Sequence, residues 1–132
     1  MRYALDTHVL VWWYADDRKL PRHYRRLLSQ LETRHERVGV SAIGLWELAK
    51  LVDRGRLRLS RSLDDCLSDI EQNPSVEVLP ITARIAAESI RLGSSFPRDP
   101  ADQVIVATAR CHGLTLLTRD DAIRDSGVVP VL

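Results

Sequence analysis

The sequence is poor in the features that would place it outside the ordinary globular proteins. Its two cysteines, Cys66 and Cys111, have neither metal-site spacing nor a disulfide framework, so we expect a reducing cytoplasm. The longest apolar stretches, VLVWWYA and VIVATA, are far too short to span a bilayer. An aspartate interrupts the apolar start of the chain, which makes it a poor signal peptide. We therefore expect a cytoplasmic protein that does not enter a membrane.

Lysine is also scarce, because only Lys19 and Lys50 of the 19 basic residues are lysines. The net charge of +1 does not by itself indicate a nucleic-acid binder. Arginine suits bidentate contacts to phosphate, but a GC-rich genome would give the same bias, so both explanations stay open. Neither GxxxxGK[ST] nor GxGxxG occurs, which disfavours phosphoryl transfer from a nucleotide.

What the chain does contain is an alternation of short apolar runs and amphipathic segments. Strands are expected at 2–6, 38–40, 76–80 and 114–118, with a further possible strand at 128–131. Helices are expected at 21–36, 41–55, 62–72, 82–93, 100–112 and 120–127, and Gly55, Gly93 and Gly113 mark three of their ends. This order predicts parallel pairing with right-handed crossovers, in one domain over residues 1–132. The expected fold is α/β, a three-layer α/β/α sandwich around a mostly parallel sheet.

Four acidic residues are expected at the sheet edge where ligands bind in such folds. Asp6 follows the first strand, and Asp120 comes two residues after the strand at 114–118. Asp102 lies in the first turn of a helix that approaches the same edge. Glu47 lies about two turns into the helix after strand 38–40, so it needs its longer side chain to reach.

Helix capping offers a structural explanation for several of these acids. Asp6 and Asp120 each precede a short helical segment, and Asp99 fits an N-cap with Pro100 at the first helical position. Asp102 at the third position then suits the helix dipole. An acid on an apolar helix face is costly unless it is paired or bound to a metal, however, and this applies to Asp102 and also to Glu47.

Carboxylates that converge on one crevice repel one another. At a separation of about 5 Å and an effective dielectric of about 20, each ionised pair costs roughly 3 kcal/mol. Either some are protonated or a cation lies among them, and oxygen ligands favour Mg²⁺ or Mn²⁺ over zinc. The histidines show no ligand spacing and are expected at the surface or at helix ends: His8, His23, His35 and His112. Carboxylate-bound Mg²⁺ is typical of phosphodiester hydrolysis, in which it activates water and orients the phosphate.

Four segments, LDTHVLVWW, SAIGLWELAK, DPADQVIVATA and LLTRD, together resemble the PIN-domain ribonucleases, and within them the VapC-type toxins of type II toxin–antitoxin pairs. The resemblance spans Arg2 to about Asp120. It implies a Mg²⁺-dependent endoribonuclease, with Mn²⁺ as a possible substitute, that cuts tRNA or rRNA by water attack. The catalytic and metal-binding set that it implies is Asp6, Glu47, Asp102 and Asp120.

The resemblance also gives expectations for neighbouring residues. Thr7 and Thr118 match polar positions beside the acids. Asp99 is interpreted mainly as the helix cap and Asp102 mainly as the ligand. Many members with DPxD have a histidine before it, where this chain has Arg98, so a general-acid role is in doubt and a phosphate contact is the remaining expectation.

Partners follow from the same resemblance, which implies a homodimer and a small antitoxin protein whose segment lies across the active site. The antitoxin groove is expected to include Trp12, Trp46 and Leu48, with a purely structural core role as the alternative. No DNA-binding element is evident, so contact with DNA is expected only through the antitoxin. In an extended segment, Arg54, Arg56, Arg58 and Arg61 would share one face suited to an RNA backbone, or would form a solvated edge.

Two other classes of protein share part of this pattern. A non-catalytic PIN-like module that binds RNA or a protein is the alternative, but it has no need for a mutually repelling set of acids. A receiver-like phosphoacceptor domain also gathers aspartates at strand ends. It requires a lysine after a late strand, and this chain has none there.

Overall fold

Four short strands form a fully parallel sheet in the computed structural model, which describes residues 1–132. The strands are β1 (Tyr3–Leu5), β2 (Val38–Ser41), β3 (Val76–Leu79) and β4 (Thr115–Leu117), in the spatial order β3-β2-β1-β4. In the register, Leu5 of β1 lies opposite Val40 of β2 and Leu117 of β4. The expected strand at 128–131 is wrong: only Val131 forms a single parallel bridge, to Leu116.

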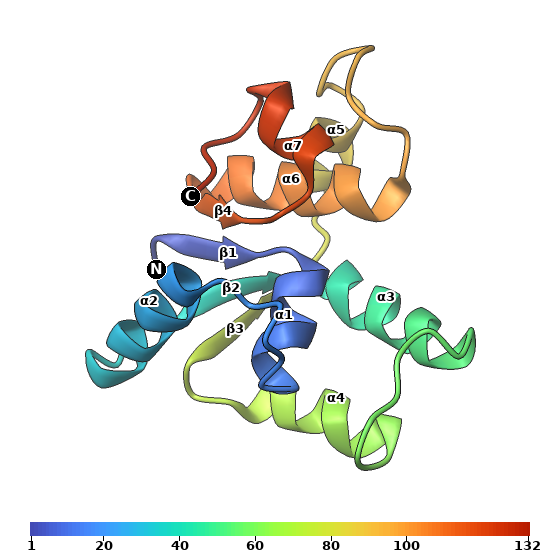
Figure 1. Ribbon diagram of the computed structural model, residues 1–132. Helices are drawn as coiled ribbons and strands as arrows, with labels where there is room; N and C mark the ends of the chain where they lie inside the picture. The colour runs from blue at the N-terminus through green and yellow to red at the C-terminus, as the bar shows by residue number, and fades with distance from the viewer.

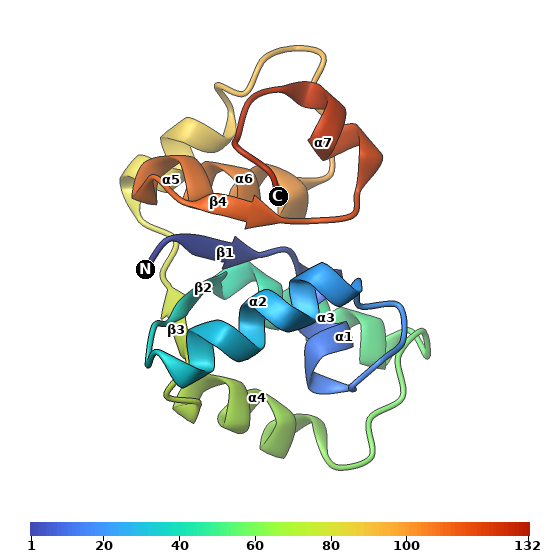
Figure 2. The same cartoon turned by 60° about the vertical axis from the view of Figure 1, so that its left-hand side comes forward.

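Seven helices surround the sheet: α1 (Thr7–Tyr14), α2 (Arg22–Thr33), α3 (Ala42–Asp53), α4 (Leu63–Gln72), α5 (Ala83–Ser89), α6 (Pro100–His112) and α7 (Asp121–Ser126). Figure 1 and Figure 2 show α1, α2 and α4 on one face of the sheet and α5, α6 and α7 on the other. Helix α3 lies at the end of the sheet, in contact with α1 and α6. The predicted three-layer fold is confirmed. None of these helices combines the length and the hydrophobicity that a membrane-spanning helix needs.

Two hydrophobic cores lie on opposite faces of the sheet because successive strand side chains point to opposite sides. Leu5 and Leu117 belong to the core with α1, α2 and α4, while Ala4 and Leu116 belong to the core with α6 and α7. Each of these leucines is at most 2% exposed, and burying such a side chain stabilises the fold by about 2 kcal/mol. The two cores fix the strand ends from which the polar site is built.

The ends of α6 follow the expected signals, whereas the end of α5 does not. Asp99 caps α6, Pro100 begins it, and Gly113 ends it with a left-handed φ of 64°. Helix α5 was expected to continue to Gly93 but ends at Ser89. The physical reason is tertiary, because Leu92 and the nearby Phe96 are buried in the core beside α6, and the chain must leave the helix to place them there.

Candidate active site

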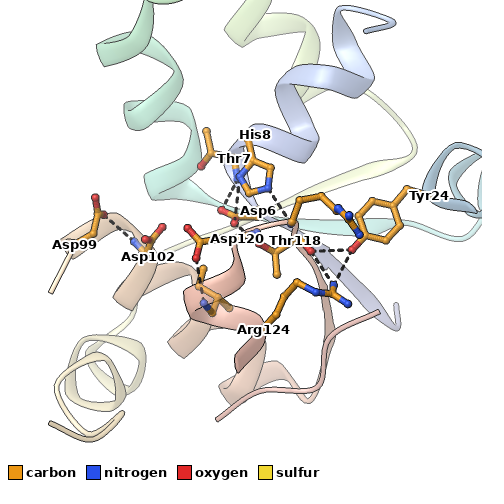
Figure 3. Close-up of polar contacts among 11 residues, drawn as sticks. Asp6, Thr7, His8, Tyr24, Asp99, Asp102, Thr118, Asp120 and Arg124 are labelled. Atoms are coloured by element: carbon orange, nitrogen blue, oxygen red, sulfur yellow. Dashed lines mark hydrogen bonds and ion pairs between the residues drawn. The ribbon is translucent and has the colours of Figure 1, made fainter. Parts of the chain in front are cut away.

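The polar site lies at the carboxyl-terminal edge of the sheet, where several helices begin. Asp6 follows β1 and caps α1, Asp120 follows β4 and caps α7, and Asp99 caps α6. Each of these carboxylates accepts a hydrogen bond from a backbone N–H near the start of its own helix. Figure 3 shows the three side chains near Asp102. The capping explanation is therefore correct for all three, and it leaves each of them with a second oxygen.

Asp6 is the most buried acid, with 2% of its surface exposed. Its Oδ1 accepts a hydrogen bond from the Thr7 backbone N–H at 2.8 Å, and its Oδ2 accepts one from Thr118 Oγ1 at 2.6 Å. His8 Nδ1 lies 3.4 Å from the same Oδ2. Thr118 Oγ1 in turn accepts a hydrogen bond from the Asp120 backbone N–H at 3.1 Å. These contacts hold Asp6 rigidly beside the loop that carries Asp120.

Three carboxylates approach most closely at the junction of α3 and α6. Oxygen atoms of Glu47, Asp99 and Asp102 all lie within 4.8 Å of one another. This trio differs from the predicted set, because Asp99 joins it directly while Asp6 and Asp120 lie beside it. Glu47 reaches the trio from α3, as its longer side chain was expected to allow.

Two acids of the site, Asp102 and Glu47, have raised pKa values. The pKa of Asp102 is raised from 3.8 to about 7, mainly by burial and in smaller part by the charges of Asp6, Asp99, Asp120 and Glu47. Burial also raises the pKa of Glu47. The Thr7 hydroxyl lies near this carboxylate without forming a hydrogen bond of normal geometry and is the main effect that opposes the shift, while the charges of Asp6 and Asp99 add smaller increases. The negative charges of the other four acids therefore all act on Asp102.

No lysine or arginine forms an ion pair with these acids. None of the ion pairs in the structure involves Glu47, Asp99, Asp102 or Asp120, and Asp6 has only His8. Thr7 Oγ1 is buried without a hydrogen-bond partner, which is unusual for a hydroxyl that is removed from water. A Cβ added at Gly44 of α3 would lie 3.5 Å from that hydroxyl, so the glycine leaves room around it.

These features fit a hard divalent cation. The donors are carboxylate oxygens together with a free hydroxyl, and such ligands suit Mg²⁺ or Mn²⁺. A cation held by these acids would offset their mutual repulsion, which contributes to the raised pKa of Asp102.

Sequence reasoning missed three residues that support the site. Tyr24 is fully buried, and it contacts the Thr118 carbonyl together with Arg124. His8, expected only at the surface or a helix end, does lie in the first turn of α1, but it also accepts a hydrogen bond from the Arg119 backbone N–H. The sequence offers a signal only for His8, which is two residues from Asp6.

The predicted RNA-binding arginines, Arg98, Arg54, Arg56 and Arg58, are all exposed, and none forms an ion pair within the chain. The extended segment expected over residues 54–61 is wrong at its start, because Arg54 is the C-cap of α3 and Gly55 turns the chain with a left-handed φ of 69°. Only residues 57–59 lack a helix, strand, turn or bend. Arg61 pairs instead with Asp69.

The three predicted groove residues lie in different surroundings. Trp12 is half-buried and its ring packs 4.9 Å from that of His8. Trp46 is 54% exposed on α3, where Lys50 lies over its ring. Leu48 is buried in the core and lines an apolar cavity of about 230 Å³.

The chain is similar to known proteins over most of its length. Residues 3–128 match the model of the PIN domain family, and the chain belongs to that family. Within it, the chain is related to Ribonuclease VapC22 of Mycobacterium tuberculosis, with 37% identity over 120 residues that cover 91% of this chain and 88% of the relative. The resemblance inferred from the four sequence segments is thereby confirmed.

Solved structures give the same fold. FitAcB from Neisseria gonorrhoeae is 27% identical, with a TM-score of 0.67 over 98% of this chain and 96% of that chain. VapBC2 from Rickettsia felis, bound to a DNA fragment from their promoter, is 20% identical, with a TM-score of 0.74 over 100% of this chain and 98% of that chain.

Proposed function

We propose that this chain is a VapC-type endoribonuclease that hydrolyses RNA phosphodiester bonds with Mg²⁺, or Mn²⁺ in its place, at the acidic site. The observation that carries the proposal is the trio of Glu47, Asp99 and Asp102, which converge without a compensating basic side chain. Membership of the PIN domain family and the relation to a named ribonuclease support it. A module that only binds RNA or protein has no use for such a costly arrangement.

The trio would hold the cation, with Asp6 and Asp120 beside it. When bound, the ion supplies Lewis-acid activation of water and of the scissile phosphate. The chain's own contribution is a rigid set of oxygen ligands, because Asp6 is fixed by Thr118 and by its own helix. Since these groups are already oriented, little reorganisation is needed when the reaction occurs.

The substrate that we propose is structured RNA, with tRNA or rRNA as the target. The exposed arginines Arg98, Arg54, Arg56 and Arg58 carry positive charge that no acid of this chain neutralises by an ion pair. Such side chains suit the phosphate backbone, which dominates the affinity of RNA-binding surfaces.

We propose an antitoxin protein as the physiological partner, and a homodimer as the toxin's own assembly. An apolar segment of the antitoxin fits the cavity lined by Val11, Leu48, Leu57 and Leu59. The VapBC2 neighbour was solved with a DNA fragment from its promoter, and we propose that this chain meets DNA only through its antitoxin.

The test is cleavage of total cellular RNA by the purified protein, with Mg²⁺ or with EDTA, beside an Asp6→Asn variant. Asparagine still caps α1 but removes the charge at the site. Discrete fragments that disappear with EDTA and with the variant would support the proposal. Intact RNA throughout, from folded protein free of antitoxin, would overturn it in favour of a binding module.

A further inference from the structure

The peptide group that joins Thr118 to Arg119 is held by hydrogen bonds at both ends. Its carbonyl oxygen accepts hydrogen bonds from the Tyr24 hydroxyl at 2.9 Å and from Arg124 Nη1 at 3.0 Å, as Figure 3 shows. Its N–H donates to His8 Nε2 at 3.0 Å. Because a peptide group is planar, contacts at its two ends fix the orientation of the whole unit between β4 and α7.

The orientation of this peptide group matters because Thr118 connects two of the acids. Its hydroxyl donates to Asp6 Oδ2 at 2.6 Å and accepts from the Asp120 backbone N–H at 3.1 Å. Thr118 is fully buried and follows directly after β4, in a segment without regular secondary structure. A rotation of its main chain would therefore move the hydroxyl away from Asp6.

Tyr24 and Arg124 contact the same two oxygen atoms, and we call this pair of side chains the clamp. Both also bind the carbonyl oxygen of Leu132, Tyr24 at 2.6 Å and Arg124 at 2.8 Å. The Tyr24 hydroxyl has a single proton, so it donates to only one of the two oxygens at a time, whereas the two N–H groups of Arg124 Nη1 can serve both. Tyr24 comes from α2, and no side-chain hydrogen bond or ion pair connects either member of the clamp to an acid of the site, although the Arg124 backbone N–H donates to the Asp120 carbonyl oxygen at the start of α7.

We propose that Tyr24 and Arg124 are positioning residues, which orient Asp6 and Asp120 by fixing the main chain of Thr118. This inference rests on the proposed function, since it assigns the clamp a role in RNA cleavage. It predicts that removing the Tyr24 hydroxyl acts through the Thr118 hydroxyl and not through general loss of stability.

The test is a double-mutant cycle of Tyr24→Phe and Thr118→Val, which measures whether the two substitutions act through one another. We would measure kcat and KM for an RNA oligonucleotide that the unaltered protein cleaves, and Mn²⁺ affinity by electron paramagnetic resonance. Tyr24→Phe is expected to lower kcat about tenfold with KM unchanged, because small displacements of reacting groups are costly. In the Thr118→Val background it is expected to have no further effect. Arg124→Leu is expected to behave in the same way and serves if Tyr24→Phe fails to fold.

Tyr14→Phe is the matched control, because its hydroxyl also forms a hydrogen bond, to Asn73 at 2.8 Å, away from the acids. It is expected to lower stability without changing kcat. An equal loss of kcat from Tyr24→Phe in both backgrounds, or no loss in either, would overturn the positioning role. If the unaltered protein cleaves no RNA, the proposed function is overturned, and the same cycle read in Mn²⁺ affinity decides whether the clamp positions the acids.

Discussion

The Asp99 carboxylate and the Asp102 backbone N–H are joined by a hydrogen bond of 3.1 Å, while the side chains of both residues belong to one acidic trio. Asp99 thus caps α6 and faces the site at the same time. The two roles use one carboxylate, so substitutions that keep the cap but remove the charge can separate them.

Asp99→Ala is expected to lower the free energy of unfolding by about 1 kcal/mol, because α6 loses its N-cap. Asp99→Ser keeps a capping oxygen, so its stability should lie within about 0.5 kcal/mol of the unaltered protein. Both variants should bind Mn²⁺ more weakly. Denaturant unfolding measures the effect on stability, and Mn²⁺ titration measures the effect on metal binding. If the serine variant binds Mn²⁺ with full affinity, Asp99 only caps α6 and does not bind the metal.

Asp102→Asn is expected to stabilise the metal-free protein while abolishing cleavage. The substitution removes a carboxylate that burial and four neighbouring acids disfavour, and after allowance for solvent screening the gain should be about 1 kcal/mol. Cleavage should fall by about 100-fold or more, since a charged group at the reacting centre is lost. Thermal unfolding in EDTA and an RNA cleavage assay are the measurements. A destabilised variant would contradict the repulsion argument.

The stability of the metal-free protein should depend on pH in a direction set by Asp102. Its pKa is raised from 3.8 to about 7, so between these values the folded state binds more protons than the unfolded chain. The contribution of Asp102 to stability is therefore present at low pH and is lost as pH rises toward 7. Because a cation competes with that proton, Mg²⁺ should raise Tm more at about pH 8 than at about pH 5. Asp102→Asn should remove this difference, and an equal shift at both pH values would argue against a cation at Asp102.

Thr7→Val is expected to cost little stability in the metal-free protein. The Thr7 hydroxyl is buried and has no hydrogen-bond partner, so replacing it with a methyl group of similar size removes an unsatisfied polar group. RNA cleavage and Mn²⁺ affinity should nevertheless decrease, and Thr7→Ser should restore both. A valine variant with full activity would show that the hydroxyl has no role at the site.

The triple substitution Arg54→Gln, Arg56→Gln and Arg58→Gln should weaken RNA binding and reduce its salt dependence. Three lost phosphate contacts would lower the slope of log affinity against log salt by about 2 for a single strand. Binding would be measured with an uncleaved RNA over a range of salt concentrations. The control is Arg37→Gln, whose arginine pairs with Glu77 at the opposite end of the strands. If the slope equals that of the control, these three arginines do not contact RNA phosphates and are simply solvated surface residues.

Local signals in the sequence were sufficient for most of the fold. The cap at Asp99, the stop at Gly113 and the four strands were predicted because each depends on nearby residues. The end of α5 was not, because burial of Leu92 and Phe96 in a distant core decides it. The supposed strand at 128–131 has the right composition but pairs at only one residue.

In the site, too, local sequence predicts some features, while others depend on tertiary packing. Asp6, Asp102 and Asp120 could be placed because each lies at a strand end or a helix start. The approach of Asp99 to Glu47 depends on how α3 packs against α6, which no local pattern specifies. Tyr24 and Thr118 are 94 residues apart, so their contact becomes visible only in the folded chain.

The central position of β1 determines when the site can form during synthesis. Asp6 precedes its partner Thr118 by 112 residues, and its neighbour Asp120 comes later still. Since β1 pairs with β4, the nascent chain must be extended past residue 120 before the acids can meet. The proposed nuclease activity would therefore be absent from a nascent chain that ends before Asp120.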